Sequence, residues 1–196
     1  MDILFEAAKS WIELSKSYYI ITYGLRKKLY DLKIVFDNYD FYHLAGFQYL
    51  NDLTLPAVSR AKIINAILDG KINGEYIIKG KMYLSQVKTR LTALINLEFA
   101  LDNDFRLFKY NPNFYPFYTQ IEADYLIEGY SKDSALFFFT IKIDKNYQGA
   151  SIFMKGDRDF SANHKSLSLL KKEKLNVYTN KGVSLFDKLS SQKQLK

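Results

Sequence analysis

The spacing of apolar side chains changes once along this chain, near residue 104, and this change constrains the fold more than any other feature. Between residues 82 and 101 apolar residues recur every three or four positions, which is typical of one face of a helix. That face comprises Leu84, Val87, Leu91, Leu94 and Ile95, and we expect Lys88 and Arg90 to lie off it. From residue 105 to 154 the period is two, which is typical of strands. The sequence therefore predicts an α+β fold, with N-terminal helices packed on a C-terminal antiparallel sheet.

Local patterns predict the remaining elements. Helices are predicted over residues 2–16, 39–50, 57–69 and 82–101, with a short one over 161–172. Strands are predicted as a hairpin over 18–23 and 32–36, as a series over 105–110, 122–130, 134–143 and 150–154, and at 174–178. No linker or internal repeat divides the chain, so we expect one domain over residues 1–181. A basic polar tail over 182–196 should then be dispensable for folding and should strengthen RNA binding at low salt.

The formal net charge of +7 lies entirely in the C-terminal part of the chain. Residues 1–141 hold 16 Lys and Arg against 16 Asp and Glu, whereas residues 142–196 hold 12 against 5. A basic end on a neutral body indicates a polyanionic partner, and the 16% of aromatic residues would suit stacking on nucleic-acid bases. The alternative is a Lys-rich surface that simply faces water.

Several classes of chemistry are excluded by the residues that the chain lacks. There is no cysteine, and the two histidines are His43 and His164, so disulfides, thiolate zinc sites and histidine-rich metal sites are excluded. Gly70, Gly74 and Gly80 are too widely spaced for a nucleotide-binding loop. No apolar run predicts a membrane helix and the first residues lack a secretory signal, so we expect a cytoplasmic protein without a membrane partner. We expect no cofactor and no metal, which leaves acid–base chemistry by polar side chains.

The first cluster that could carry such chemistry surrounds His43. This histidine lies among aromatic and apolar residues in the segment 38–50. It is either a catalyst or a hydrogen-bonded core residue, and a lone histidine in such surroundings is more often the latter.

The second cluster spans residues 151–164. A strand that ends in Ser151 and Lys155, followed by a turn that carries Arg158, can present a hydroxyl, an ammonium and a guanidinium to one phosphate. The alternative is that Arg158 pairs with one of its neighbours, Asp157 or Asp159, on a solvated turn.

Short segments of both clusters resemble a phage- and mobile-element-associated branch of the barnase–EndoU–colicin–RelE nuclease superfamily. The segments are Phe41-Tyr42-His43-Leu44-Ala45-Gly46-Phe47-Gln48-Tyr49-Leu50-Asn51-Asp52, Ser151-Ile152-Phe153, Asp157-Arg158-Asp159-Phe160-Ser161 and Leu170-Lys171-Lys172-Glu173-Lys174. The similarity covers residues 15–178 and implies a helical part packed on a four-stranded antiparallel sheet. It also implies metal-independent ribonuclease activity.

The resemblance implies roles for three residues, with His43 as the acid or base and with Ser151 and Arg158 at the phosphate site. We expect these three residues to share one concave surface, whereas a core role predicts that His43 is buried far from Arg158. Further substrate contacts are expected from Lys155, Tyr42, Ser161 and His164. The sequence has Phe160 where the resemblance implies a tyrosine.

Three functions are compatible with these observations. RNA carries its own nucleophile, the 2′-hydroxyl, so its cleavage requires an acid–base group and positive charge rather than a covalent residue. The first hypothesis is an endoribonuclease of a phage or mobile element, acting in the bacterial host on tRNA or, as an anti-CRISPR protein, on guide RNA. The second is a non-catalytic protein of the same fold that blocks a CRISPR effector or another RNA-guided nuclease, which Phe160 favours. The third is a virion-associated protein whose basic tail binds packaged nucleic acid.

Overall fold

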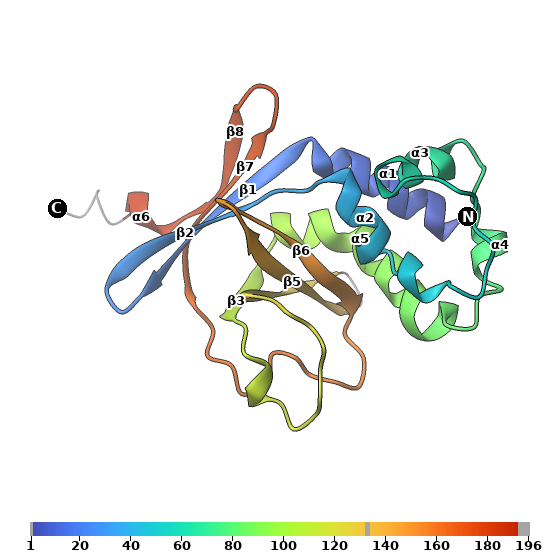
Figure 1. The fold of residues 1–196 in the computed structure, drawn as a ribbon. Helices are drawn as coiled ribbons and strands as arrows, with labels where there is room; N and C mark the ends of the chain where they lie inside the picture. The colour runs from blue at the N-terminus through green and yellow to red at the C-terminus, as the bar shows by residue number, and fades with distance from the viewer. Residues whose placement is uncertain (1, 132–133, 192–196) are drawn as a thin grey trace.

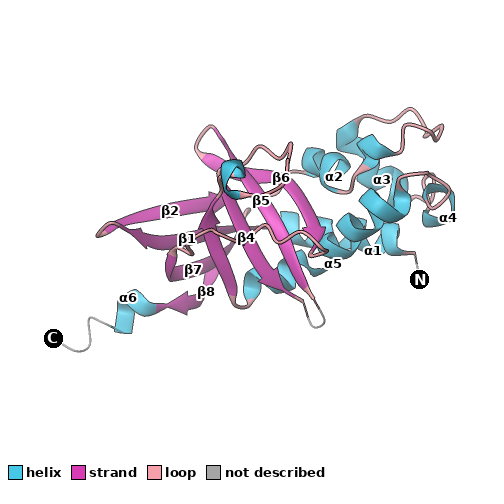
Figure 2. Ribbon diagram, turned by 90° about the horizontal axis from the view of Figure 1, so that it is seen from below, coloured by secondary structure: helices cyan, strands magenta, loops and turns pink. Residues whose placement is uncertain are grey.

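The computed structural model describes residues 2–131 and 134–191 (Figure 1). Most helices gather at one end of the molecule, and a large curved sheet forms the other (Figures 1 and 2). The helical elements are α1 (Ile3–Ser15), α2 (Asn38–Leu44), η1 (Phe47–Tyr49), η2 (Arg60–Lys62), α3 (Ile63–Leu68), α4 (Gly74–Ile77), the π-helical turn η3 (Tyr83–Val87), α5 (Lys88–Asp102), η4 (Pro112–Phe114) and α6 (Lys188–Ser191). The strands are β1 (Ser17–Leu25), β2 (Lys28–Ile34), β3 (Phe105–Lys109), β4 (Tyr125–Tyr130), β5 (Ala135–Ile143), β6 (Asn146–Met154), β7 (Ser168–Asn176) and β8 (Gly182–Asp187).

The strands form one sheet in the order β3-β4-β5-β6-β2-β1-β7-β8. Strands β3 to β6 are an antiparallel meander, as the period of two predicts. Strands β2, β1, β7 and β8 form a second antiparallel group, and the two groups join where Ile34 of β2 pairs in parallel with Tyr147 of β6. The α+β prediction is thus confirmed, although the sheet is larger than residues 105–154 because the N-terminal hairpin and two C-terminal strands extend it.

The central strands bury both faces of the sheet. In β5, Leu136 and Phe138 belong to the main core, which includes the apolar side of α5, whereas Phe137 and Phe139 point to the opposite face. On that opposite face lies a second group of buried residues, here called the aromatic cluster. It comprises Phe108, Tyr110, Tyr115, Leu126, Phe137, Phe139 and Phe160. Helix α5 packs against β4, β5 and β6, as predicted.

Two predictions for the C-terminal part are wrong. The helix expected over 161–172 does not form, because residues 168–172 belong to β7, which pairs with β1 along its length and also contains residues 174–176 of the strand expected over 174–178. The polar tail expected from residue 182 begins instead with β8, which pairs with β7 and packs Leu185 against the core. Backbone pairing with an already formed strand edge outweighs weak local helix propensity here. Residues 192–196 of the expected tail lie outside the described residues.

Helices of the N-terminal half are shorter than predicted. The helix expected over 39–50 ends at Leu44, because Gly46 takes a left-handed conformation with a φ of 86°. The helix expected over 57–69 contains η2 and the short helix α3.

Candidate functional site

The candidate site is built along an edge of β6 that is covered by helices rather than by another strand. In the described ranges, β2 meets this edge only at Tyr147. Further along, the ring Nε2 of His43 donates to the Ala150 carbonyl at 3.0 Å, and Nη1 of Arg90 donates to the Ile152 carbonyl at 3.3 Å. The Met154 amide donates to Oγ1 of Thr89 at 3.0 Å. Three side chains from α2 and α5 therefore occupy backbone groups that a neighbouring strand would otherwise pair.

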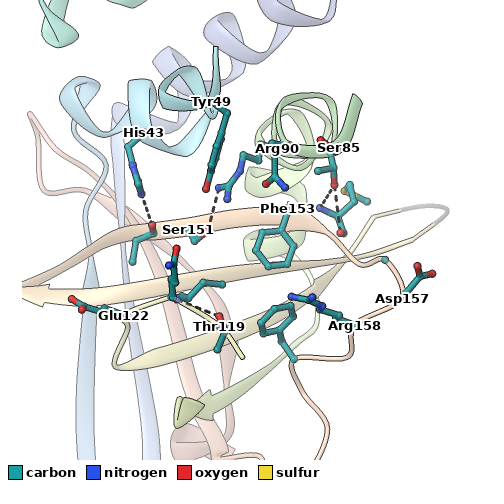
Figure 3. Close-up of a pocket in the computed structure, with 18 of the residues that line it drawn as sticks. His43, Tyr49, Ser85, Arg90, Thr119, Glu122, Ser151, Phe153, Asp157 and Arg158 are labelled. Atoms are coloured by element: carbon teal, nitrogen blue, oxygen red, sulfur yellow. Dashed lines mark hydrogen bonds between the residues drawn. The ribbon is translucent and has the colours of Figure 1, made fainter. Parts of the chain in front are cut away.

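A groove of about 1210 Å³ opens beside this edge. Its walls come from α2, from the start of α5, from β6 and from the loop over residues 118–122. His43, Ser151 and Arg158 all line it, so the prediction that these distant residues share one concave surface is confirmed. Figure 3 shows His43, Tyr49 and Arg90 pointing from the helical segments towards β6, with Arg158 in the turn that follows this strand.

His43 is exposed on the groove side and is held in one orientation by its hydrogen bond to Ala150. Because a carbonyl oxygen can only accept, Nε2 carries the hydrogen, and Nδ1 keeps its lone pair in the neutral ring. Partial burial lowers the pKa of His43 below 6.5, and the positive charges of Arg90 and Arg60 lower it further, against the effect of the Ala150 hydrogen bond. The ring is therefore neutral at pH 7, with Nδ1 available as a base.

Arg90 is a groove residue that the sequence did not point to. It is only 6% exposed, so the expectation that it lies off the apolar face of its helix is wrong. Its Nη1 donates to Oγ of Ser151 at 3.1 Å, and its guanidinium carbon lies 5.3 Å from the ring centroid of Tyr49 and 5.7 Å from that of Phe153. The spacing of Val87, Arg90 and Leu91 gave a usable signal, because positions i, i+3 and i+4 share one face of a helix.

Gly46 allows the helical segment that carries His43 to approach Arg90 closely. A Cβ atom at this position would lie 2.9 Å from Cδ of Arg90, and the positive φ of 86° already disfavours any residue with a side chain. The end of α2 and the position of the Arg90 side chain therefore depend on the same glycine.

Arg158 does not pair with the neighbouring Asp159. Its guanidinium carbon lies 5.1 Å from the ring centroid of Phe117, and its side chain is exposed in the groove. Asp159 instead accepts hydrogen bonds from Lys155 at 2.9 Å and from the Ser161 hydroxyl at 2.7 Å. Burial raises the pKa of Asp159, but the bonds from Lys155 and Ser161 outweigh it and bring the value to about 2.

Four residues expected to contact substrate are not part of the groove lining, and their roles stay predictions. Lys155 pairs with Asp159 and, at 3.5 Å, with the buried Glu128. Tyr42 stacks on Phe47. Ser161 joins the Asp159 network, and His164 uses both ring nitrogens on backbone groups, because Nδ1 donates to the Ala162 carbonyl and Nε2 accepts from the Asn111 amide.

Two aromatic residues of the groove have contrasting surroundings. Tyr118 is 80% exposed at the rim, and no sequence pattern marked its loop as part of a site. Phe160, which stands where a tyrosine was implied, is buried in the aromatic cluster and forms part of the groove wall. Its ring centroid lies 5.3 Å from that of Phe153 and 5.4 Å from that of Phe139. Phe160 therefore presents an apolar ring, without a hydroxyl, at a buried part of the wall.

Within residues 2–131 and 134–191, no group of three or more His, Asp or Glu side chains is arranged to hold a metal ion. Every helix in the same ranges is too short or too polar to span a bilayer. The groove itself contains two carboxylates, those of Glu122 and Asp157, together with the two guanidinium groups of Arg90 and Arg158.

Comparison with known proteins identifies one family. The family model described as phage-Barnase-EndoU-ColicinE5/D-RelE like nuclease4 matches residues 3–189, which include His43, Arg90, Ser151 and Arg158. No curated protein and no solved structure matches the chain. Because the match spans nearly the whole sequence, the protein belongs to this family of phage-associated nucleases related to barnase, EndoU, colicins and RelE.

Proposed function

We propose that this protein is a metal-independent endoribonuclease and that the groove beside β6 is its active site. The observation that supports the proposal best is the presence of His43, Ser151 and Arg158 in one groove. A neutral imidazole with a free Nδ1 and an exposed guanidinium are the two kinds of group that phosphodiester cleavage by RNA's own hydroxyl requires.

In the proposed reaction, Nδ1 of His43 takes the proton of the RNA 2′-hydroxyl. The 2′ oxygen then forms a bond to phosphorus while the bond from phosphorus to the 5′ oxygen breaks, and water in the open groove supplies the proton for the leaving oxygen. Arg158 stabilises the negative charge on the phosphorane oxygens, and the Ser151 hydroxyl contacts the phosphate. The products are a 2′,3′-cyclic phosphate and a 5′-hydroxyl.

The proposed substrate is RNA of the bacterial host in which a phage or mobile element acts. Two structured RNAs are the first to test, namely tRNA and the guide RNA of a CRISPR effector. Cleavage of guide RNA would make the protein an anti-CRISPR enzyme, and the test should include guide RNA bound to its effector protein.

The deciding experiment incubates the purified protein with total bacterial RNA, tRNA and guide RNA in EDTA and analyses the ends of the products. Cyclic phosphate ends that appear in EDTA support the proposal, whereas cleavage that requires added Mg²⁺ contradicts it.

The second candidate is the non-catalytic inhibitor of a protein–RNA complex. It is favoured by the engagement of His43 Nε2 with Ala150 and by the missing hydroxyl at Phe160, and it predicts tight binding with no cleavage.

A further inference from the structure

Arg90 is a buried cation for which the described part of the chain offers no carboxylate partner. Its hydrogen-bond acceptors, the Ser151 hydroxyl and the Ile152 carbonyl, are neutral oxygens, and so is the hydroxyl of Tyr49 that lies against it. Lys174, another partly buried cation of the fold, is neutralised by Glu98 and Asp102. Burying an ion without a counter-charge is costly, so this arrangement does not serve stability alone.

Lys172 shows what a purely structural buried cation looks like in this fold. Its ammonium is nearly inaccessible and donates to the carbonyl oxygens of Leu101 and Asn103, at the C-terminal end of α5, where the helix dipole favours positive charge. Arg90 lies in the same helix but far from that C-terminal end, near the junction of α5 with the π-helical turn η3, and it lines an open groove. Its position is therefore explained by neither a carboxylate nor the helix.

We infer that Arg90 is the main phosphate-binding residue of the groove and that an RNA phosphodiester supplies its missing counter-charge. The inference rests on the proposed function and extends it to a residue that neither the resemblance nor the sequence assigned. Tyr49 and Phe153 keep water away from the guanidinium, and a charge in such surroundings attracts an anion more strongly than an exposed one does.

Ser151 completes the phosphate site. Its hydroxyl oxygen accepts from Arg90, so its own hydrogen is left to donate to a second acceptor. Arg158 is exposed and contacts the phosphate from the outer side of the groove, whereas Arg90 contacts it from the inner side. The buried guanidinium thus fixes the position of the phosphate, and the exposed one adds charge.

The test measures binding of a 2′-O-methyl RNA oligonucleotide, which cannot be cleaved, to Arg90→Met, Arg90→Lys and the unmodified protein. Arg90→Met should weaken binding about 10- to 100-fold, because a charge-assisted contact is lost. Arg90→Lys keeps the charge without the planar fork and should give an intermediate affinity. Inorganic phosphate should raise the melting temperature of the unmodified protein more than that of either variant.

The matched control is Arg26→Met, which removes the same charge from the turn between β1 and β2, away from α2 and α5 (Figure 1). It should change affinity by less than about threefold, and its slope of affinity against salt should show what one surface charge contributes. The inference is overturned if Arg90→Lys and Arg90→Met bind as Arg26→Met does. If Arg90→Met does not fold, Arg90→Lys alone decides, and an unchanged affinity overturns the inference.

The same experiment separates this inference from the proposed function. An unmodified protein that binds the oligonucleotide through Arg90 but leaves natural RNA intact would contradict the proposed cleavage and support the phosphate site. A protein that cleaves RNA in EDTA and whose Arg90 variants bind normally would support the cleavage and contradict the role of Arg90.

Discussion

Replacing His43 by glutamine and by alanine should separate its structural role from its chemical one. A glutamine amide can still donate to the Ala150 carbonyl, so His43→Gln preserves this hydrogen bond to the β6 edge. Glutamine cannot, however, accept a proton near neutral pH. His43→Ala removes both functions. Because the ring is exposed and water can replace it, the loss of this hydrogen bond should cost about 0.5–1 kcal/mol of unfolding free energy. Both variants should lower the cleavage rate about 10²- to 10⁴-fold, the usual contribution of one acid–base group.

The assay combines initial rates on a labelled RNA in EDTA with unfolding in urea. Since the pKa of His43 lies below 6.5, the base form predominates at pH 7, and the rate should be constant there and should fall as His43 is protonated at lower pH. Asp40, three residues earlier, is a second group that titrates below neutral pH, because burial and the neighbouring Asp37 raise its pKa to about 6. Asp40→Asn is therefore the control, and it should leave the fall in cleavage rate at low pH unchanged. The role of His43 would be refuted if His43→Gln still showed the fall in rate at low pH, or if its cleavage rate stayed within threefold of that of the unmodified protein.

Three further predictions concern the groove and the sheet. Gly46→Ala should lower the unfolding free energy in urea by about 1–3 kcal/mol and also weaken RNA binding, because of the positive φ and the 2.9 Å approach to Arg90; an unchanged stability would contradict the argument. Tyr118→Ala should weaken the binding of single-stranded RNA about 5- to 100-fold in fluorescence anisotropy, because a side chain on which bases can stack is lost. The control is Tyr178→Ala, at a residue that is 82% exposed and lies outside the groove lining, and it should leave binding unchanged; equal effects of the two variants would argue against stacking. Truncation after Lys181 removes β8 and should lower the melting temperature and promote aggregation in light scattering, and a truncated protein as stable as the full chain would show that β8 adds nothing.

The elements whose side chains follow a simple apolar pattern could be predicted from the sequence. The meander from residue 105 was predicted because each strand alternates around buried phenylalanines and leucines. Strand β7 was predicted only at its end, by the strand expected over 174–178, because its inward positions include Lys172 and Lys174. These residues are buried through their aliphatic stems, while their ammonium groups reach carbonyl oxygens and carboxylates at the end of α5. A pattern that counts lysine as polar therefore predicts a surface segment where a strand is buried.

The candidate site was predictable to the extent that its residues occur in polar clusters. His43, Ser151 and Arg158 stand out locally, and the groove brings them together. Lys155 also stood out, but it pairs with the nearby Asp159 and with Glu128, which the tertiary fold brings from β4 and which no local pattern shows. Arg90 occupies a core-facing helix position that is ordinarily apolar, so its charge was assigned to the surface. Tyr118 lies in an irregular loop whose path depends on the whole sheet.

The way the edge of β6 is covered also bears on self-association. An open strand edge is a template on which another chain can add a strand, and His43, Arg90 and Thr89 cover the one that borders the groove. We therefore expect the residues proposed to act on RNA to limit self-association as well. Variants at these positions should therefore be tested by size-exclusion chromatography as well as by activity, because a loss of cleavage accompanied by oligomers reflects an uncovered edge rather than missing chemistry. Natural variation at His43 and Arg90 would be constrained by both requirements, solubility and catalysis.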